Sequence, residues 1–235
     1  MNHDAAMDQP QQVAPSPSQL VDEAKAAAPS RDAADVAKSA EREKWRASLR
    51  EANQHVWLHG PQESGDSLDA SLKRNSAFIK RLKQTNLADA KDALVKEVQL
   101  LSLTKYLDEL IPSIPEILWK ATTLKDRYAA IEILCALHAR FGGSEFTEPL
   151  LKVMEQEIVP PPPKSQDASN EQAQKEAALV ARQRSLLRGV TEMVLVGLVG
   201  PMTQSEGVCA PGLNWLYEQL RKMLSQDRDL VYTSV

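Results

Sequence analysis

The sequence has few of the residues from which catalytic and metal sites are built. Cysteine occurs only at Cys135 and Cys209, which lie far apart and outside any CxxC pair. Neither a disulfide framework nor a zinc site is therefore indicated. A phosphate-binding Gly-rich loop, a nucleophile elbow and an HExxH motif are also missing. We expect a protein that is not an enzyme and that has no catalytic residues, no metal site and no cofactor.

Long apolar segments are missing as well. The longest apolar stretch, residues 193–199, is far shorter than the roughly 20 residues that a membrane-spanning helix needs. The chain starts with Met1-Asn2-His3-Asp4, without the basic start and apolar core of a secretory signal. These features predict a protein of the cytoplasm, including its perinuclear part, that does not contact membranes.

Aromatic residues make up only 5% of the chain and glycine occurs 9 times, whereas Ala, Leu, Glu, Lys, Gln and Arg dominate. These abundant residues lose little side-chain freedom in a helix, so the composition favours α-helix. A hydrophobic fraction of 43% is typical of a folded protein. The net charge of -4 excludes a globally basic nucleic-acid coat, but it is compatible with a local basic surface.

Two stretches of unusual composition divide the chain. Residues 1–36 are mostly Ala, Pro, Gln, Ser and Asp, with few large apolar side chains to bury, which predicts a disordered tail. Residues 159–170 contain four consecutive prolines, Pro160 to Pro163, which predict an extended, solvated loop. The remaining residues, 37–235, are expected to form one helical-repeat domain on both sides of this Pro-rich loop.

Apolar residues in this region recur at steps of three and four, which is the spacing of amphipathic helices. Ser67 is placed to cap the first of them, in which Asn75 interrupts an apolar stripe and is expected to fasten the backbone of a neighbouring loop. Phe78 is expected at the edge of that stripe. The stripe consists of Leu68, Leu72, Asn75, Ile79 and Leu82.

Polar residues and prolines mark the ends of the later helices. Pro112 is expected to end one helix, and Ser113 with Glu116 has the spacing of a capping box for a short helix that ends near residue 119. Thr123 with Asp126 predicts the start of the next helix, which Gly142 ends.

Thr147 is placed to cap a further helix, and a long helix is expected over residues 172–200, apolar on almost all sides from Val190 onward. The last helix starts after Pro211-Gly212, with an apolar face of Leu213, Leu216, Tyr217, Leu220 and Leu224. Strand-like alternation is missing, so the sequence predicts an all-α fold of antiparallel helix pairs stacked as repeats.

Two pairs of residues have spacings that resemble chemical sites. Cys135 and His138 are three residues apart and would suit a nucleophile pair, but they share a helix face with core residues, and we expect them to be buried. His55 and His59 are four residues apart, as in a metal site, but no further ligand at suitable spacing completes the set. We expect them to mark a helix end that is packed by Trp57.

A basic helix face is the most prominent candidate for binding. Its cations are expected to lie opposite the apolar stripe of residues 68–82 and to contact RNA phosphates or an acidic partner. A solvated face that serves only solubility is the alternative. No aromatic residue interleaves with the cations, which argues against recognition by base stacking. The candidate residues are Lys73, Arg74, Lys80, Arg81 and Lys83, and a weaker second cluster comprises Arg182, Arg184 and Arg188.

Specific strings carry a family resemblance in addition to these patterns. They are SLKRNSAFIKRL at 71–82, LSLTKY at 101–106, IEILCALHARF at 131–141, LRGVTEMVLVGL at 187–198 and LYEQL at 216–220. In this order they resemble the first MIF4G domain of the up-frameshift two scaffold family of nonsense-mediated mRNA decay. The resemblance covers roughly residues 40–225. Pro112, Pro115 and the Pro-rich loop depart from the family pattern.

The resemblance implies a superhelix of HEAT-like or armadillo-type repeats that serves as an interaction platform in the mRNA surveillance complex. RNA is a further candidate ligand through the basic helix face described above. Family scaffolds have three such domains. The third binds the up-frameshift three protein, and a C-terminal segment binds the up-frameshift one helicase, so both partner sites are expected to lie outside this chain. This chain is expected to stop inside or just after the first domain, so the domain over 37–235 is either incomplete or complete at its C-terminal end. A MIF4G-type domain of a translation-initiation or cap-binding factor that docks an RNA helicase is the alternative.

Overall fold

The computed structural model describes residues 17–62, 68–84, 86–159, 170–200 and 211–226. The chain divides into two compact units, Met1–Trp45 and Arg46–Val235. The first helix, α1 (Pro17–His59), begins in the first unit and ends in the second. Residues 17–36 are therefore helical, and the predicted disordered tail is wrong for them, whereas residues 1–16 lie outside the described part. The prediction rested on the lack of large apolar side chains to bury. An Ala-rich segment, however, has a high intrinsic helix propensity even without a core.

The second unit is all helical in its described residues, which confirms the predicted fold class. The isolated bridge between Asp69 and Leu101 is the one piece of β-structure in the described residues. After α1 the elements are α2 (Leu72–Leu82), α3 (Leu87–Leu100), the 3-10 turn η1 (Thr104–Tyr106), α4 (Leu107–Lys120), α5 (Leu124–Gly142), the π-helical turn η2 (Gly143–Thr147), α6 (Glu148–Glu157), α7 (Asn170–Leu195) and α8 (Pro211–Gln226).

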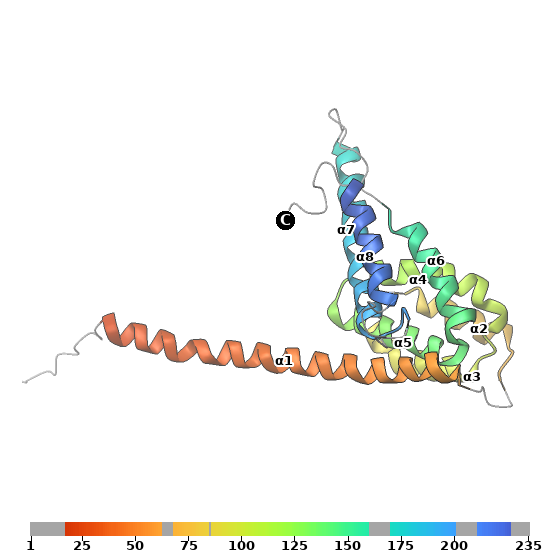
Figure 1. Ribbon diagram of the computed structural model, residues 1–235, viewed down its shortest axis with the longest axis horizontal. Coiled ribbons are helices and arrows are strands. Elements are labelled where there is room, and N and C mark those ends of the chain that lie inside the picture. The colour runs from red at the N-terminus through yellow and green to blue at the C-terminus, as the bar shows by residue number, and fades with distance from the viewer. Residues whose placement is uncertain (1–16, 63–67, 85, 160–169, 201–210, 227–235) are drawn as a thin grey trace, which may run out of the picture. The chain divides into compact units, whose positions relative to one another are not determined.

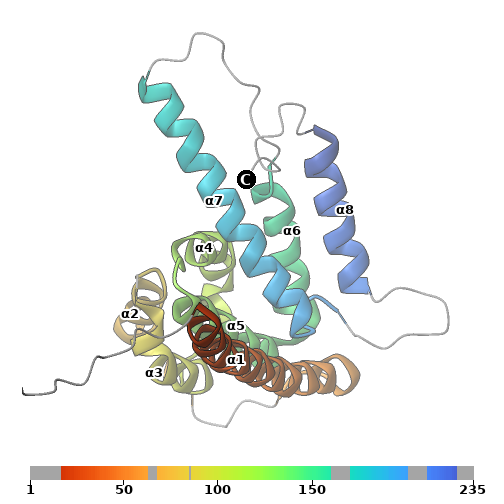
Figure 2. The ribbon, with the colours of Figure 1, turned by 90° about the vertical axis from the view of Figure 1, so that its left-hand side faces the viewer.

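Helix α5 forms the centre of the second unit. It packs against α3 on one side and contacts α7 on another, while α4 packs against both α6 and α7 (Figures 1 and 2). Helix α8 lies against α7, at the end of the series farthest from α2. Ile131, Ile133, Leu134 and Leu137 of α5 are almost completely buried, as expected of a helix with neighbours on several sides.

The last turns of α7 are also buried on several sides, as the sequence predicts. Val190, Met193 and Val194 are buried within the helix, and Val196 and Leu198 are buried just after it. The helix ends at Leu195, earlier than the predicted residue 200, because Gly197 has a φ of 71°, outside the right-handed helical region.

Helix α4 continues through both of its prolines, so the predicted break at Pro112 is wrong. Pro112 and Pro115 each remove one backbone donor from the helix. Leu110, Ile114 and Leu118 of the same helix are fully buried, and their burial offsets this loss. Ser113 does not open a capping box, because its hydroxyl donates a hydrogen bond to the carbonyl of Leu110 at 2.7 Å.

The first residues of α2 differ from the predicted stripe. Ser67 lies outside the described residues, and α2 begins only at Leu72, whose side chain is 68% exposed. Phe78 is fully buried at the centre of the apolar face rather than at its edge. The prediction for Asn75 is confirmed, because its amide donates to the backbone carbonyls of Asp69 at 3.2 Å and Ser71 at 2.9 Å.

The predicted ends of α5 are confirmed, whereas the predicted cap of α6 is wrong. Thr123 caps α5, because its hydroxyl accepts a hydrogen bond from the Asp126 amide at 3.1 Å. Gly142 ends the same helix with a φ of 76°. Thr147 precedes α6 but does not cap it, because its buried hydroxyl is hydrogen-bonded to His138 instead.

The apolar face predicted for α8 does not form part of the core. Met223 and Gln219 are buried and Leu216 is half-buried, whereas Leu213, Tyr217, Leu220 and Leu224 are exposed. Gly212 at the start of α8 lies close to Val199, since a Cβ at Gly212 would lie 3.2 Å from the Val199 carbonyl oxygen.

Candidate interaction surface

The five basic residues predicted to bind RNA or a partner lie on or just after α2. Arg74 forms an ion pair with Asp69, and Arg81 forms one with Glu97. The Ser71 amide and the Arg74 guanidinium together lower the pKa of Asp69, so that this carboxylate stays charged beside the arginine. Lys83 lies 3.7 Å from Glu109. Three of the five cations are therefore neutralised by neighbouring carboxylates.

Lys73 and Lys80 remain as the exposed cations of this face. Neither makes an ion pair within the described residues, and they are seven residues apart, which places both on one side of α2. The structure thus brings the predicted residues together on one element, but the net positive charge of the face is smaller than the sequence suggested. The acidic partners come from the segment before α2, from α3 and from α4, so helix periodicity within α2 did not reveal them.

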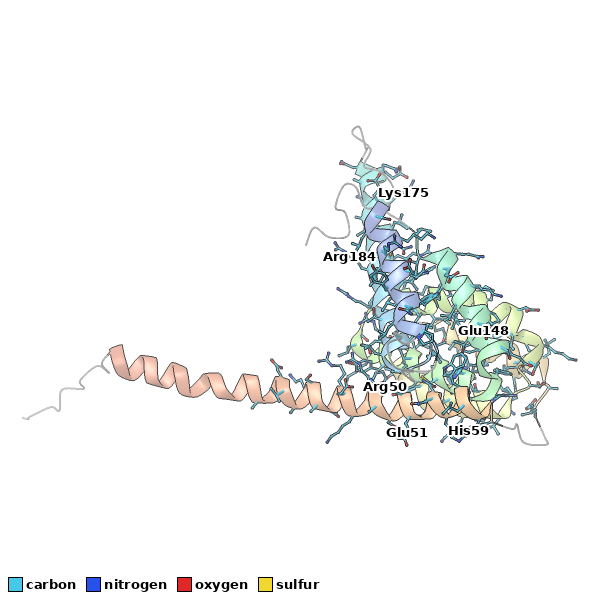
Figure 3. All side chains as sticks on the ribbon, in the orientation of Figure 1. Arg50, Glu51, His59, Glu148, Lys175 and Arg184 are labelled. Atoms are coloured by element: carbon cyan, nitrogen blue, oxygen red, sulfur yellow. The ribbon has the colours of Figure 1, made fainter. Side chains whose placement is uncertain are left out.

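The second basic cluster does not act as a unit either. The Arg182 guanidinium stacks over the ring of Trp119 at 3.4 Å and pairs with Glu157, which connects α7 to α4 and α6. Arg184 projects from the same helix, as Figure 3 shows. Arg188 is exposed. Arg182 thus has a packing role between α4, α6 and α7.

Cys135 and His138 are core residues, as predicted. Burial raises the pKa of the Cys135 thiol to about 12 and lowers the pKa of His138 to about 4. The His138 Nδ1 atom lies 2.7 Å from the Thr147 hydroxyl, and the Asn53 amide donates to the Cys135 sulfur at 3.2 Å. A thiol that stays protonated at neutral pH is a poor nucleophile, so these neighbours have a structural role.

His55 and His59 are both exposed on α1, and their ring centroids are 4.5 Å apart. His59 is labelled near the end of α1 in Figure 3. No group of three or more potential metal ligands occurs among the residues that the structure describes. Trp57, between the two histidines, points into the protein. Its indole nitrogen donates to the Gly197 carbonyl at 3.1 Å, and its ring lies 4.9 Å from that of His138.

The contact between α1 and the C-terminal end of α7 was not predicted. Arg46 forms a two-pronged ion pair with Glu192, at 2.6 and 2.9 Å. Arg50 donates twice to the Leu195 carbonyl at the C-terminal end of α7, and the Asn53 amide donates to the Val196 carbonyl at 2.8 Å. The spacing of Arg46, Arg50, Asn53 and Trp57, at steps of three and four, could have indicated this face.

No helix among the described residues is long and apolar enough to cross a membrane. No family model matches the chain. The chain is 39% identical over 132 residues to nonsense-mediated mRNA decay protein 2 of Saccharomyces cerevisiae. The match covers 56% of this chain and 12% of that protein. The chain is also 32% identical over 192 residues to regulator of nonsense transcripts 2 of Mus musculus. This match covers 80% of this chain and 13% of that protein.

A solved structure has the same fold. It is the N-terminal mIF4G domain of S. cerevisiae Upf2, a protein involved in the degradation of mRNAs containing premature stop codons. The TM-score is 0.61 at 29% sequence identity, and the match covers 81% of this chain and 62% of that one. The chain therefore spans only about an eighth of the length of its full-length relatives, and most of a single mIF4G domain.

Proposed function

This chain is a homologue of the regulator of nonsense transcripts 2 proteins and shares the fold of the N-terminal mIF4G domain of Upf2, and on this premise we propose that it is a scaffold domain of nonsense-mediated mRNA decay. The observation that carries the proposal is the agreement of sequence and fold over about four-fifths of the chain. A helical array presents a long outer surface on a rigid frame, which suits the docking of other proteins.

A chimeric scaffold tests this proposal. The matching segment of S. cerevisiae nonsense-mediated mRNA decay protein 2 is replaced by this chain in cells that lack the natural protein. We expect an mRNA with a premature stop codon to decay faster than in the deletion strain, while its normal counterpart keeps the same half-life. The proposed role would be contradicted if the chimera is soluble and folded but the reporter mRNA has the same half-life as in the deletion strain.

The partners of the scaffold follow from the same proposal. The up-frameshift one helicase and the up-frameshift three protein would bind parts of the full-length scaffold outside this chain, in the cytoplasm. Affinity purification of this chain alone, followed by mass spectrometry, is expected to recover decay factors of the mRNA surveillance complex. Recovery of translation-initiation or cap-binding factors in their place would favour the alternative, a helical domain that docks an RNA helicase of the initiation machinery.

RNA contact through α2 is a finer part of the proposal, and it depends on the two unpaired lysines. Changing Lys73 and Lys80 to Glu is expected to weaken binding to a fluorescent oligouridylate about tenfold at low salt, because two phosphate contacts are lost and two repulsive charges are gained. Fluorescence anisotropy at two salt concentrations measures the affinity and its salt dependence.

Lys152→Glu is the matched control for these substitutions, because Lys152 is an exposed lysine on α6. It should change the affinity little. Replacement of Arg74 or Arg81 is expected to affect stability more than RNA affinity, since both already pair with carboxylates. If the double lysine variant binds as tightly as the unchanged protein at low salt, α2 is only a solvated face.

A further inference from the structure

Ser76 is an exposed serine in the basic part of α2. Lys73 and Arg74 precede it by three and two positions, and the apolar Ala77 follows it. No other serine or threonine of the chain has cations at both of these preceding positions. Some serine/threonine kinases select their substrates by this charge pattern, because acidic groups of the kinase contact the basic residues. The sequence around Ser76 thus has the charges of a kinase substrate.

The N-terminal half of α2 can open locally, which a kinase requires because it binds its substrate in an extended conformation. Ser71 precedes the helix but makes no side-chain cap, so the first turn lacks this stabilisation. Within α2, Asn75 is the only buried residue before Ser76. The apolar side chains that anchor the helix in the core all follow Ser76, and they are Phe78, Ile79 and Leu82. Opening of the helix up to Ser76 therefore breaks the hydrogen bonds of Asn75 but exposes no apolar core side chain, so it costs less than global unfolding.

Lys73 and Lys80 flank Ser76 on the same side of α2. Lys73 lies three residues before Ser76 and Lys80 lies four residues after it, and at these spacings the side chains of a helix meet. Both lysines are exposed, and neither has an ion pair within the residues that the structure describes. A phosphate group on Ser76 would therefore lie between two ammonium groups that are available to pair with it.

We propose that Ser76 is a phosphorylation site, modified by a serine/threonine kinase that recognises basic residues before its target. The kinase transfers the γ-phosphoryl group of ATP to the Ser76 Oγ atom. The bond from the γ-phosphorus to the oxygen that bridges to the β-phosphate breaks, ADP leaves, and the hydroxyl proton passes to the catalytic carboxylate of the kinase. The product has a charge of about -1.5 to -2 at neutral pH, which matches the two flanking lysines. Phosphorylation therefore neutralises the cations that this helix face presents to solvent.

Phosphorylation also acts on the RNA contact proposed for α2, and this consequence rests on that proposed function. Lys73 and Lys80 would pair with the phosphate of Ser76 in place of RNA phosphates, so the modified chain should bind oligouridylate at least tenfold more weakly than the unmodified chain. The modification itself depends only on the charges and the opening of α2. Failure of the unmodified chain to bind oligouridylate would contradict the RNA contact alone, because the mapping of the phosphate needs no RNA.

Incubation of the folded full chain with ATP and the catalytic subunit of cyclic-AMP-dependent protein kinase tests the site, with the phosphate mapped by mass spectrometry. This kinase prefers two basic residues at the positions that Lys73 and Arg74 occupy, so Ser76 is expected to be modified. Ser185 is the internal control, because Arg182 precedes it by three positions but Ser185 is buried on α7. Both serines should be modified in synthetic peptides of residues 71–82 and 180–191, and only Ser76 in the folded chain.

Phosphorus NMR of the modified chain tests the contact with the lysines. A neighbouring cation favours the doubly charged phosphate, so Lys80→Gln should raise the second pKa of the phosphate by about 0.3, the equivalent of one ion pair at this helical spacing. The substitution should not slow the modification, since Lys80 follows the target serine. Lys152→Gln, which removes an exposed lysine on α6, should change neither quantity.

Three outcomes would overturn the proposal. Absence of phosphate on Ser76 in the folded chain would show that α2 is not a substrate. Equal modification of Ser185 in the folded chain would show that the kinase captures the unfolded chain and not the opened α2. A phosphate pKa that is the same with and without Lys80 would show that the lysines do not pair with the modified serine.

Discussion

Lowering the pH from 6.5 to about 4 is expected to reduce the free energy of unfolding by about 3 kcal/mol through His138 alone. Burial lowers the pKa of His138 in the folded protein to about 4, although backbone hydrogen bonds of Asn53 and Gly142 oppose this shift. The unfolded chain takes up a proton near the ordinary pKa of 6.5, and the folded protein does not. The stabilisation is therefore complete above pH 6.5, declines as the pH falls, and is lost near pH 4.

Urea unfolding followed by circular dichroism at several pH values between 4 and 7 measures this loss. His138→Gln should flatten the pH dependence in this window, because glutamine does not titrate and its amide can still reach the Thr147 hydroxyl. The matched control is His55→Gln, since His55 lies exposed on α1, and its profile should follow that of the unchanged protein. A profile that stays equally steep in the His138→Gln variant would show that other groups cause the acid sensitivity.

Trp57→Ala is expected to destabilise the second unit by about 3 kcal/mol, since a large ring is removed from a packed site. The ring lies against His138 and Gly143, and its nitrogen satisfies the Gly197 carbonyl, so three elements lose a contact at once. Chemical unfolding measures the effect. Leu58→Ala, at a neighbouring residue that is 60% exposed, should cost less than about 1 kcal/mol. Equal effects of the two substitutions would contradict the assigned packing.

Gly143→Ala examines the same contact from the other side. Gly143 has a φ of -70°, which suits any residue, but a Cβ there would lie 2.8 Å from the Trp57 Cη2 atom. We expect a cost of about 2 kcal/mol, as for other overpacked sites. In the Trp57→Ala background the same change should be neutral or slightly stabilising, because the obstacle is gone and alanine restricts the unfolded chain. Additive effects in this double-mutant cycle would show that the two residues do not touch.

The candidate surface was predicted in part from sequence. The helical spacing of Lys73 and Lys80 placed them on one face of α2, and the structure agrees. Arg81 met its partner Glu97 only because α2 packs against α3, a contact between elements that no local pattern specifies.

Composition and periodicity by themselves determined that this protein is helical and that α5 begins after Thr123 and ends at Gly142. They also determined which residues of α5 and of the end of α7 are buried. Helix propensity and the spacing of apolar side chains are local properties, so they can be taken from the sequence alone. Tertiary structure decided the rest. It carried α4 through Pro112 because the surrounding side chains are buried, rotated α8 so that Leu220 faces outward, and redirected Thr147 from capping to His138. Each of these outcomes depends on the free energy of contacts between segments distant in sequence, which outweighs the smaller local preferences.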